Sequence, residues 1–213
     1  MSTLIQKLHP ALYLGRRLAL AGGRQPLFSR QGVWDSGSAL HCVAMALAML
    51  GRLSDPVDVR GYSGGPVAQF WNRAWPHYLH GLTPSELASF VWELNAGVHP
   101  IEVKGSADET LHFCGQELAA GWPVIVWIVN RRNEERHAAL AIGLEERDSV
   151  PKALLLLDPA GATPVLAACN ARLEPGKPHA SYITAEANVR ASLHGAVSIR
   201  RPQENDATSA GCA

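Results

Sequence analysis

The second half of the chain contains three short apolar runs, and each run is bounded by charged residues, Pro or Gly. They span residues 123–129, 137–144 and 153–157. Apolar runs of this length between such boundaries are typical of β-strands that are buried on both faces. We expect a further strand at 196–199, and the charged segment 130–136 is expected to connect the first two strands as a hairpin. The pattern predicts a buried antiparallel sheet.

The most apolar segment of the first half, residues 38–50, has apolar side chains on nearly all sides of a helical projection. A helix of that kind is buried in the centre of a protein rather than lying on its surface. Asp35 and Ser36 precede the segment and offer capping side chains, and Gly51 follows it as a stop signal. We therefore expect a central buried helix here.

Two further helices are expected before the strands. Thr83 and Glu86 form the pattern of a capping box with a Pro between them, which predicts a helix that runs to about residue 94. The next helix is expected over residues 108–120. By contrast, residues 54–80 are rich in Trp, Gly and Pro without clean periodicity, and we expect loops and short helices there.

Helices that come first and strands that come later indicate an α+β protein rather than an alternating βαβ fold. The chain has 213 residues, a length that suits one domain. We expect a single domain over residues 1–201. Residues 202–213 lack periodic apolar side chains and are expected to form a disordered tail.

Composition excludes several classes of function. The 19 Lys and Arg residues balance 19 Asp and Glu residues, which argues against nucleic acid or an anionic membrane surface as a partner. The longest apolar run, residues 42–50, is shorter than the roughly 20 residues of a membrane span. The cysteines show neither metal-ligand spacing nor the density of a disulfide scaffold. They are Cys42, Cys114, Cys169 and Cys212. We expect a cytoplasmic protein with no metal and no cofactor.

Three polar residues stand where an apolar element is expected to begin or end. Ser38 begins the central helix, His137 begins a strand, and Asp158 follows the next strand. Backbone N–H groups at a helix N-terminus stabilise a developing negative charge, and an acid beside a His can orient its imidazole. This is the arrangement of nucleophile, base and orienting acid in covalent catalysis. Gln31 could add a side-chain amide to an oxyanion hole.

The segment from Gln31 to Gly51 resembles the active-site helix of papain-like cysteine peptidases. The closest resemblance is to the bacteriocin-processing peptidases that remove double-glycine leaders, and to their stand-alone relatives. Their pattern is Gln, a short spacer, an Asp before the nucleophile, and an apolar helix that contains Met and ends in Gly. The strand that begins with His137 matches the family's His strand, and residues 121–126 match the strand before it. Asp158 and the Pro that follows match the family's Asp-Pro.

The resemblance implies an α+β, papain-like fold, in which a helical part with the active-site helix packs on an antiparallel β-sheet. It also implies a peptidase that acts on a peptide or protein substrate, with a preference for small residues such as Gly beside the scissile bond. His137 would act as general base and then acid, Asp158 would orient it, and Gln31 with the backbone N–H of residue 38 would stabilise the oxyanion. The substrate-binding residues expected on this basis are Trp34, Gly37, Ala39, Trp71 and Trp75.

The sequence departs from the family at the nucleophile. The family has Cys where this chain has Ser38, and the Gly that follows is replaced by Ala39. Cys42, one helical turn further on, matches the family's second, non-catalytic cysteine and is expected to be a buried structural residue. Serine is a much weaker nucleophile than a thiolate paired with imidazolium, so we expect little catalysis with Ser at this position. Either an inactivating Cys-to-Ser replacement or a natural Ser explains the departure.

Other functions remain open at this point. A pseudo-peptidase would use the same cleft to hold a peptide or partner protein without cutting it, and papain-like triads also serve deamidases and acyltransferases. The three residues also have ordinary structural roles. Ser38 can be a helix cap, His137 a strand-end histidine and Asp158 a turn residue. The sequence specifies neither the substrate sequence nor the oligomeric state.

Overall fold

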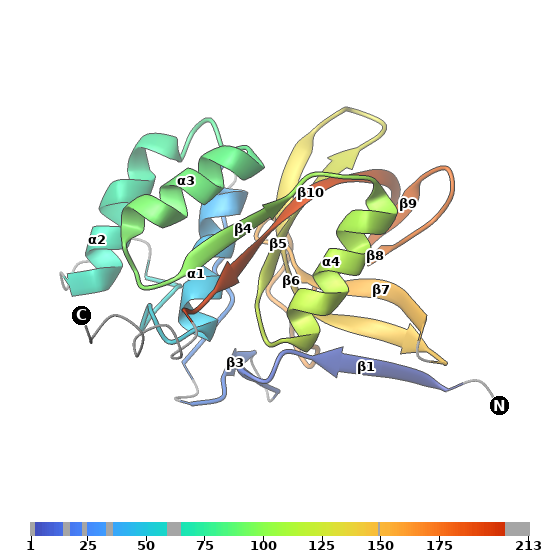
Figure 1. The fold of residues 1–213 in the computed structure, drawn as a ribbon, viewed down its shortest axis with the longest axis horizontal. Coiled ribbons are helices and arrows are strands. Elements are labelled where there is room, and N and C mark those ends of the chain that lie inside the picture. The colour runs from blue at the N-terminus through green and yellow to red at the C-terminus, as the bar shows by residue number, and fades with distance from the viewer. Residues whose placement is uncertain are drawn as a thin grey trace, which may run out of the picture.

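The computed structural model describes residues 3–14, 18–22, 25–32, 36–58, 65–148 and 150–202. Figure 1 shows most of the helices gathered on one side of a strongly curved sheet. Trp34, Asp35 and Cys212 lie outside the described residues, and so does the predicted tail apart from Pro202.

Within the described part of the chain, most strands join one antiparallel sheet. The strands are β1 (Leu4–Leu8), β2 (Leu12–Tyr13), β3 (Ala19–Leu20), β4 (His99–Val103), β5 (Val124–Asn130), β6 (Arg136–Arg147), β7 (Val150–Leu157), β8 (Ala171–Glu174), β9 (Ala180–Thr184) and β10 (Asn188–Arg200). β6, β5, β10, β9, β8 and β7 are neighbours in that order, and β7 pairs back to β6. These strands therefore close into a six-stranded barrel, which β1 extends beside β6 and β4 extends beside β10.

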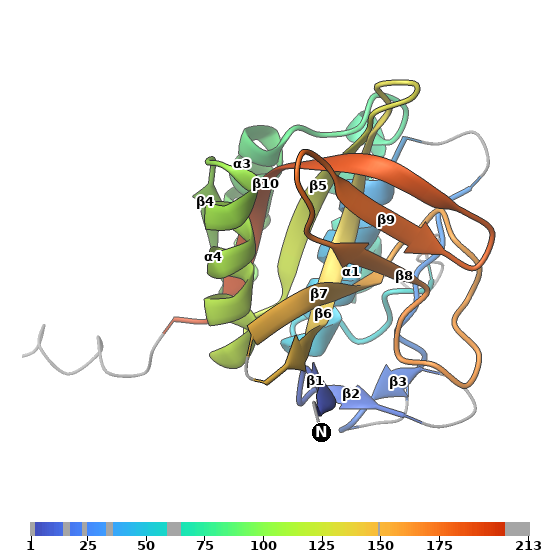
Figure 2. The same ribbon diagram turned by 90° about the vertical axis from the view of Figure 1, so that its right-hand side faces the viewer.

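The prediction of an α+β, papain-like fold with a helical part packed on an antiparallel sheet is wrong. The sheet curves until its last strand pairs with its first (Figure 2). The helices within residues 38–94 lie outside this closed barrel, whereas the helix of residues 107–119 packs against the core on its inner face. β8, β9 and the first half of β10 complete the circle, and they alternate between buried and more exposed residues. Since these segments are not continuous apolar runs, the sequence pattern does not reveal the strands that close the barrel.

The apolar runs are explained by the two faces of the barrel wall. Ile125 and Trp127 of β5 point outward and pack with the helices. Val124, Val126 and Ile128 alternate with them and belong to the core inside the barrel. The prediction that these strands are buried on both faces is therefore confirmed.

The helices are α1 (Ser38–Met49), α2 (Gly65–Ala74), α3 (Pro84–Leu94) and α4 (Ala107–Ala119), with a 3₁₀ turn η1 at Trp75–His77. Every residue of α1 is buried, and the helix packs against β5, β6 and α3, which confirms the predicted central helix. Thr83 and Glu86 form the predicted capping box of α3. The N-cap of α1 is Gly37, so the predicted cap by the Ser36 side chain is wrong.

The order of the elements differs from the prediction in one respect. β1, β2 and β3 precede the first helix, and β4 lies between α3 and α4, so helices and strands are not fully segregated along the chain. Among the described residues of the segment 54–80, the expected short helices are present as α2 and η1. Over the ranges that the structure describes, none of the helices is both long and apolar enough to cross a membrane.

Candidate functional site

The N-terminus of α1 is docked on the first residues of β6. The Oγ of Ser38 accepts a hydrogen bond from the N–H of Ala138 at 3.2 Å. One turn further along the helix, the Sγ of Cys42 donates to the Ala138 carbonyl at 3.7 Å. The pairing of β7 with β6 ends at Leu157, before it reaches Ala138, so this part of β6 is open to the helix. Ser38 therefore contacts the residue next to His137.

The imidazole of His137 is held by a buried carboxylate. Its Nε2 is hydrogen-bonded to Oδ1 of Asp158. The Ala160 N–H also donates to Oδ1, at 2.8 Å, and the Tyr182 hydroxyl donates to Oδ2 at 2.5 Å. Burial opposes ionisation of Asp158, but these donors and the charge of His137 outweigh it and hold the pKa of Asp158 below its usual range. The carboxylate orients the ring and leaves Nδ1 of His137 available for proton transfer.

Tyr182 remains a hydrogen-bond donor to this carboxylate. Burial, followed by the charge and the hydrogen bond of Asp158, raises the pKa of Tyr182 above its usual range. A protonated phenol at this position fixes the second oxygen of Asp158. The carboxylate therefore has donors on both oxygens, which restricts the orientation of His137.

Asn170 holds the backbone on either side of the carboxylate. Its Oδ1 accepts from the N–H of Asp158 at 2.7 Å, and its Nδ2 donates to the Asp158 carbonyl at 2.8 Å and to the Ala162 carbonyl at 2.9 Å. A single amide thus closes the loop between β7 and β8. Asn170 and Tyr182 were not predicted from the sequence, because they lie 12 and 24 residues from Asp158 outside any apolar run. The residues around Tyr182 alternate neither in size nor in polarity, so no local pattern indicates its role.

Gln31 lies at the same end of the barrel. Its backbone N–H donates to the carbonyl of Pro159 at 3.0 Å, which places it beside the Asp158 loop. The structure therefore brings together the four residues that the resemblance assigned to catalysis: Gln31, Ser38, His137 and Asp158. They come from four separate segments of the chain.

A cavity of about 260 Å³ opens beside His137 at this end of the barrel. His137, Asp158 and Tyr182 line one part of it. The remaining lining comes mainly from β5, β9 and β10 and their connections: Ile128, Asn130, Glu135, Ala160, Thr184, Ala187, Val189 and Ala191. Ser38 is outside this lining and approaches His137 from the side of α1. A group bound in the cavity would therefore lie against the imidazole of His137.

A second polar network reaches the same helix from its other side. His41 of α1 is fully buried, its Nδ1 lies 2.8 Å from the Ser29 hydroxyl, and its Nε2 lies 3.3 Å from the Tyr78 hydroxyl. The Tyr78 carbonyl accepts from the N–H of Ser36 at 3.0 Å. His41 therefore links the segment that carries Gln31 to the start of α1. His41 lies within the segment from Gln31 to Gly51, but no role was predicted for it from the sequence.

The structure places the predicted substrate-binding residues in different environments. Gly37 is buried as the N-cap of α1, and Ala39 is buried in the core between the helices and the barrel. Trp71 is also buried, with its ring 5.2 Å from that of His41. Trp75 is 69% exposed and stacks on Tyr78 at 5.3 Å. Of these residues only Trp75 offers a large surface, while Trp34 lies outside the described residues.

The described cysteines are not activated thiols. Burial raises the pKa of Cys42 well above its usual value, and it raises the pKa of Cys114 to about 12. Burial also raises the pKa of Cys169. In the part of the chain that the structure covers, no three His, Cys, Asp or Glu side chains form a group that could hold a metal ion.

Comparison with known protein families and with curated proteins finds no match for this chain. Its function is therefore argued from the geometry of the site. An oriented imidazole beside a helix N-terminus and a partly apolar cavity can support nucleophilic acyl transfer, provided that residue 38 supplies the nucleophile.

Proposed function

We propose that this barrel carries the active site of an acyl hydrolase that acts on peptide bonds, with residue 38 at the nucleophile position. The observation that carries the proposal is the pairing of His137 with Asp158, one residue from the contact between Ser38 and Ala138. The two donors that also hold Asp158, and the cavity beside His137, support it.

The proposed reaction assigns a role to each of these groups. The side chain of residue 38 attacks the carbonyl carbon of the scissile bond, and its proton passes to Nδ1 of His137. The negative charge that develops on the carbonyl oxygen is stabilised by the backbone N–H of residue 38 at the start of α1, with the Gln31 amide as second donor. His137 then protonates the leaving amine. Water attacks the acyl-enzyme while His137 takes one of its protons, and His137 returns that proton to the side chain of residue 38 as the acid product leaves.

Serine at position 38 limits this chemistry. A hydroxyl has a far higher pKa than a thiol, so an imidazole activates it less readily. In addition, the Ser38 side chain already accepts a hydrogen bond from Ala138, and the residue is 8% exposed. We therefore expect low activity with Ser38 and a large gain when this residue is replaced by Cys.

The test compares thiol reactivity in the Ser38→Cys variant. After brief treatment with iodoacetamide, peptide mapping measures the alkylation of the new thiol and of Cys42 in the same sample. We expect the new thiol to react at least about 10-fold faster than Cys42, because an adjacent imidazole lowers the pKa of a thiol. Hydrolysis of casein by the same variant should rise above that of the parent chain.

The dependence on His137 provides the specific control. Adding His137→Ala to the Ser38→Cys variant should slow alkylation at least about 10-fold. Adding His112→Ala should leave it unchanged, because His112 is an exposed residue of α4. The proposal would be contradicted if the new thiol were alkylated no faster than Cys42. It would also be contradicted if His137→Ala left the alkylation rate of the new thiol unchanged.

A second candidate is a module that binds peptides without cutting them. The Ser38 hydroxyl oxygen accepts its hydrogen bond from the N–H of Ala138 rather than from His137. This favours the binding module for the chain with Ser38. It predicts that the Ser38→Cys variant shows neither fast alkylation nor casein hydrolysis. Peptide binding in the cavity beside His137 would then persist without catalysis.

A further inference from the structure

A groove of about 460 Å³ adjoins the cavity beside His137 at the rim of the barrel. The two hollows share Asn130 and Val189 in their linings, so they are neighbours on the two sides of these residues. The groove itself is lined by the ends of β5 and β10, by the connection after β5, and by the loop before β9. Its charged and titratable lining residues are Arg131, Arg132, Arg190 and His179.

The arginines of this groove lack carboxylate partners. Across the described residues, none of Arg131, Arg132 and Arg190 forms an ion pair, whereas Arg172 and Arg200 are each bonded to glutamates. Asp and Glu are also absent from the groove lining. In a chain with no net charge, this is a local excess of positive charge beside the proposed active site.

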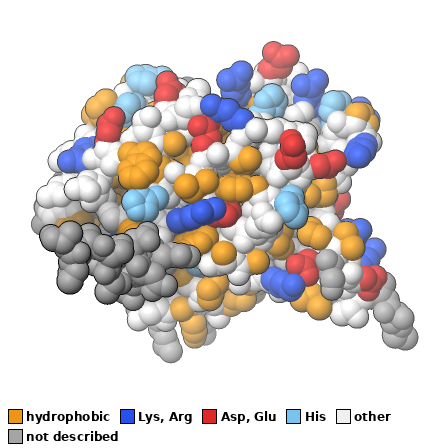
Figure 3. All heavy atoms as spheres, in the orientation of Figure 1, with side chains coloured by type: hydrophobic (Ala, Val, Ile, Leu, Met, Phe, Trp, Pro, Cys, Tyr) orange, Lys and Arg blue, Asp and Glu red, His pale blue; other side chains and the backbone are white. Residues whose placement is uncertain are grey.

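A backbone hydrogen bond joins two of these cations, and one acid of the same hairpin lines the neighbouring cavity instead of the groove. The N–H of Arg131 donates to the carbonyl of Arg190 at 3.0 Å, which joins the two strand ends. Glu135 lies on the same hairpin, but it lines the neighbouring cavity, and its carboxylate accepts a bond from Asn133. Figure 3 shows Lys, Arg and His side chains gathered over this upper end of the barrel, with some Asp and Glu among them.

We propose that this groove binds an acidic segment of the peptide substrate, next to the part that enters the cavity beside His137. This inference rests on the proposed function, because it adds a substrate class to the same site. Guanidinium groups bind carboxylates through paired hydrogen bonds, which suits Asp and Glu side chains. Single-stranded nucleic acid is the alternative polyanion, but it binds through aromatic stacking platforms, and no aromatic side chain lines the groove apart from His179.

The probe is fluorescein-labelled deca-glutamate, and fluorescence anisotropy measures its binding to the chain with Ser38 at low salt. Deca-glutamine and an oligothymidylate of equal length serve as comparison probes. We expect deca-glutamate to bind more tightly than both. Binding should weaken strongly in about 0.5 M salt, since exposed ion pairs are screened.

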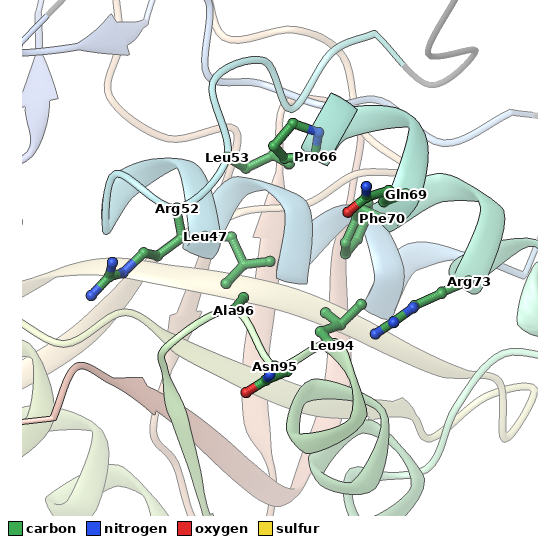
Figure 4. A pocket seen from close by; sticks show the side chains of 10 residues that line it. All are labelled: Leu47, Arg52, Leu53, Pro66, Gln69, Phe70, Arg73, Leu94, Asn95 and Ala96. Atoms are coloured by element: carbon green, nitrogen blue, oxygen red, sulfur yellow. The ribbon is translucent and has the colours of Figure 1, made fainter. Parts of the chain in front are cut away.

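The variant Arg131→Ala/Arg190→Ala should bind deca-glutamate at least about 5-fold more weakly, because it loses two exposed ion-pairing groups. Its matched control is Arg52→Ala/Arg73→Ala. These two arginines line a separate pocket of about 200 Å³ between the C-terminal end of α1 and helices α2 and α3 (Figure 4). Removing the same charge there should change the affinity less than 2-fold.

Equal effects of the two double variants, or equal binding of deca-glutamine, would overturn the proposal. Tighter binding of the oligothymidylate would identify the groove as a nucleic-acid site instead. The anisotropy measurement needs no catalysis. A lack of deca-glutamate binding would therefore overturn the proposal for the groove, whereas slow alkylation in Ser38→Cys would overturn the proposed function. Alkylation of the new thiol in Ser38→Cys/Arg131→Ala/Arg190→Ala should match that in Ser38→Cys, which shows that the site stays intact.

Discussion

A buried carboxylate destabilises a folded chain unless donors satisfy it, and three donors surround Asp158. His137, Ala160 and Tyr182 bond to its two oxygens, while Asn170 holds the backbone on both sides. A hydrogen bond to a charged group contributes about 1.5–3 kcal/mol to stability. The bonds that orient His137 therefore also stabilise this end of the barrel.

Replacement of Asp158 by Asn is expected to lower the free energy of unfolding by about 1–3 kcal/mol at pH 7. The pKa of Asp158 is lowered in the folded chain, so the stabilisation by its carboxylate is fully present above the unfolded pKa of about 3.9. It is lost as the pH falls through the lower, folded pKa. The stability difference between the variant and the parent should therefore narrow below about pH 4, as measured by urea unfolding at a series of pH values.

Asp108→Asn is the matched control for this substitution. Asp108 is exposed at the start of α4, and its carboxylate lies 3.6 Å from the Lys177 ammonium, an exposed ion pair. Its replacement should change the free energy of unfolding by less than about 1 kcal/mol at every pH. A stability gap for Asp158→Asn that stays constant through the acid range would show that ionisation of this carboxylate does not stabilise the fold.

At the scale of elements, the site depends on how α1 is held. Ser38 and Cys42 fix one face of the helix to β6, and His41 fixes another face to Ser29 and Tyr78. β6 is itself covered on its outer edge by β1, which pairs with its second half. The position of His137 relative to α1 therefore depends on contacts along the whole length of β6.

Gly143 of β6 is required by the close approach of β1. A Cβ at this position would lie 2.5 Å from the Lys7 carbonyl oxygen and 2.9 Å from a methyl group of Leu8. Gly143→Ala should therefore displace β1 and lower the free energy of unfolding by about 1–3 kcal/mol. Urea unfolding measures the loss, and faster hydrogen exchange of the β1 amides locates it.

Gly115→Ala in α4 makes the same chemical change where space is available. The nearest atom to the added Cβ would be a methyl group of Leu144 at 3.7 Å, an ordinary contact. Alanine also favours a helix interior, so this variant should be more stable by about 0.5–1 kcal/mol. If both substitutions stabilised the chain, close packing of β1 on Gly143 would be disproved.

For the molecule as a whole, two apolar cores share the same strands. One core lies inside the barrel, and the other lies between the barrel and helices α1, α2 and α3. β5, β6 and β10 contribute residues to both, because alternate side chains of one strand face opposite sides. The cores are therefore expected to unfold together.

Leu156→Ala in the barrel core and Leu47→Ala in the helical core should each lower the free energy of unfolding by about 2–5 kcal/mol. In both variants, tryptophan fluorescence and far-ultraviolet circular dichroism should report one coincident transition. Leu166→Ala, at a side chain that is 83% exposed, should change stability by less than about 0.5 kcal/mol. Separate transitions for the two cores would contradict this expectation.

The sequence predicted those elements whose signals are local. Each of these signals is contained in about a dozen residues or fewer. They are the helix at 38–50, the capping box at Thr83 and the apolar runs of β5, β6 and β7. β8 and β9 are short and half-exposed, and their strand character depends on partners that are distant in the sequence. Tyr182 and Asn170 lie in or beside these strands, so their roles beside Asp158 were not predicted either.

Local sequence patterns indicate which side chains are candidates for chemistry and where several of the buried helices and strands run. Ser38, His137 and Asp158 stand at the ends of such elements, and hydrophobic periodicity is enough to find those ends. Closure of the sheet into a barrel is visible only in the folded chain, because it depends on the pairing of β7 with β6 and on weakly apolar strands. The fold also determines which donors surround Asp158 and which arginines share a groove, since both depend on contacts between residues far apart in the chain.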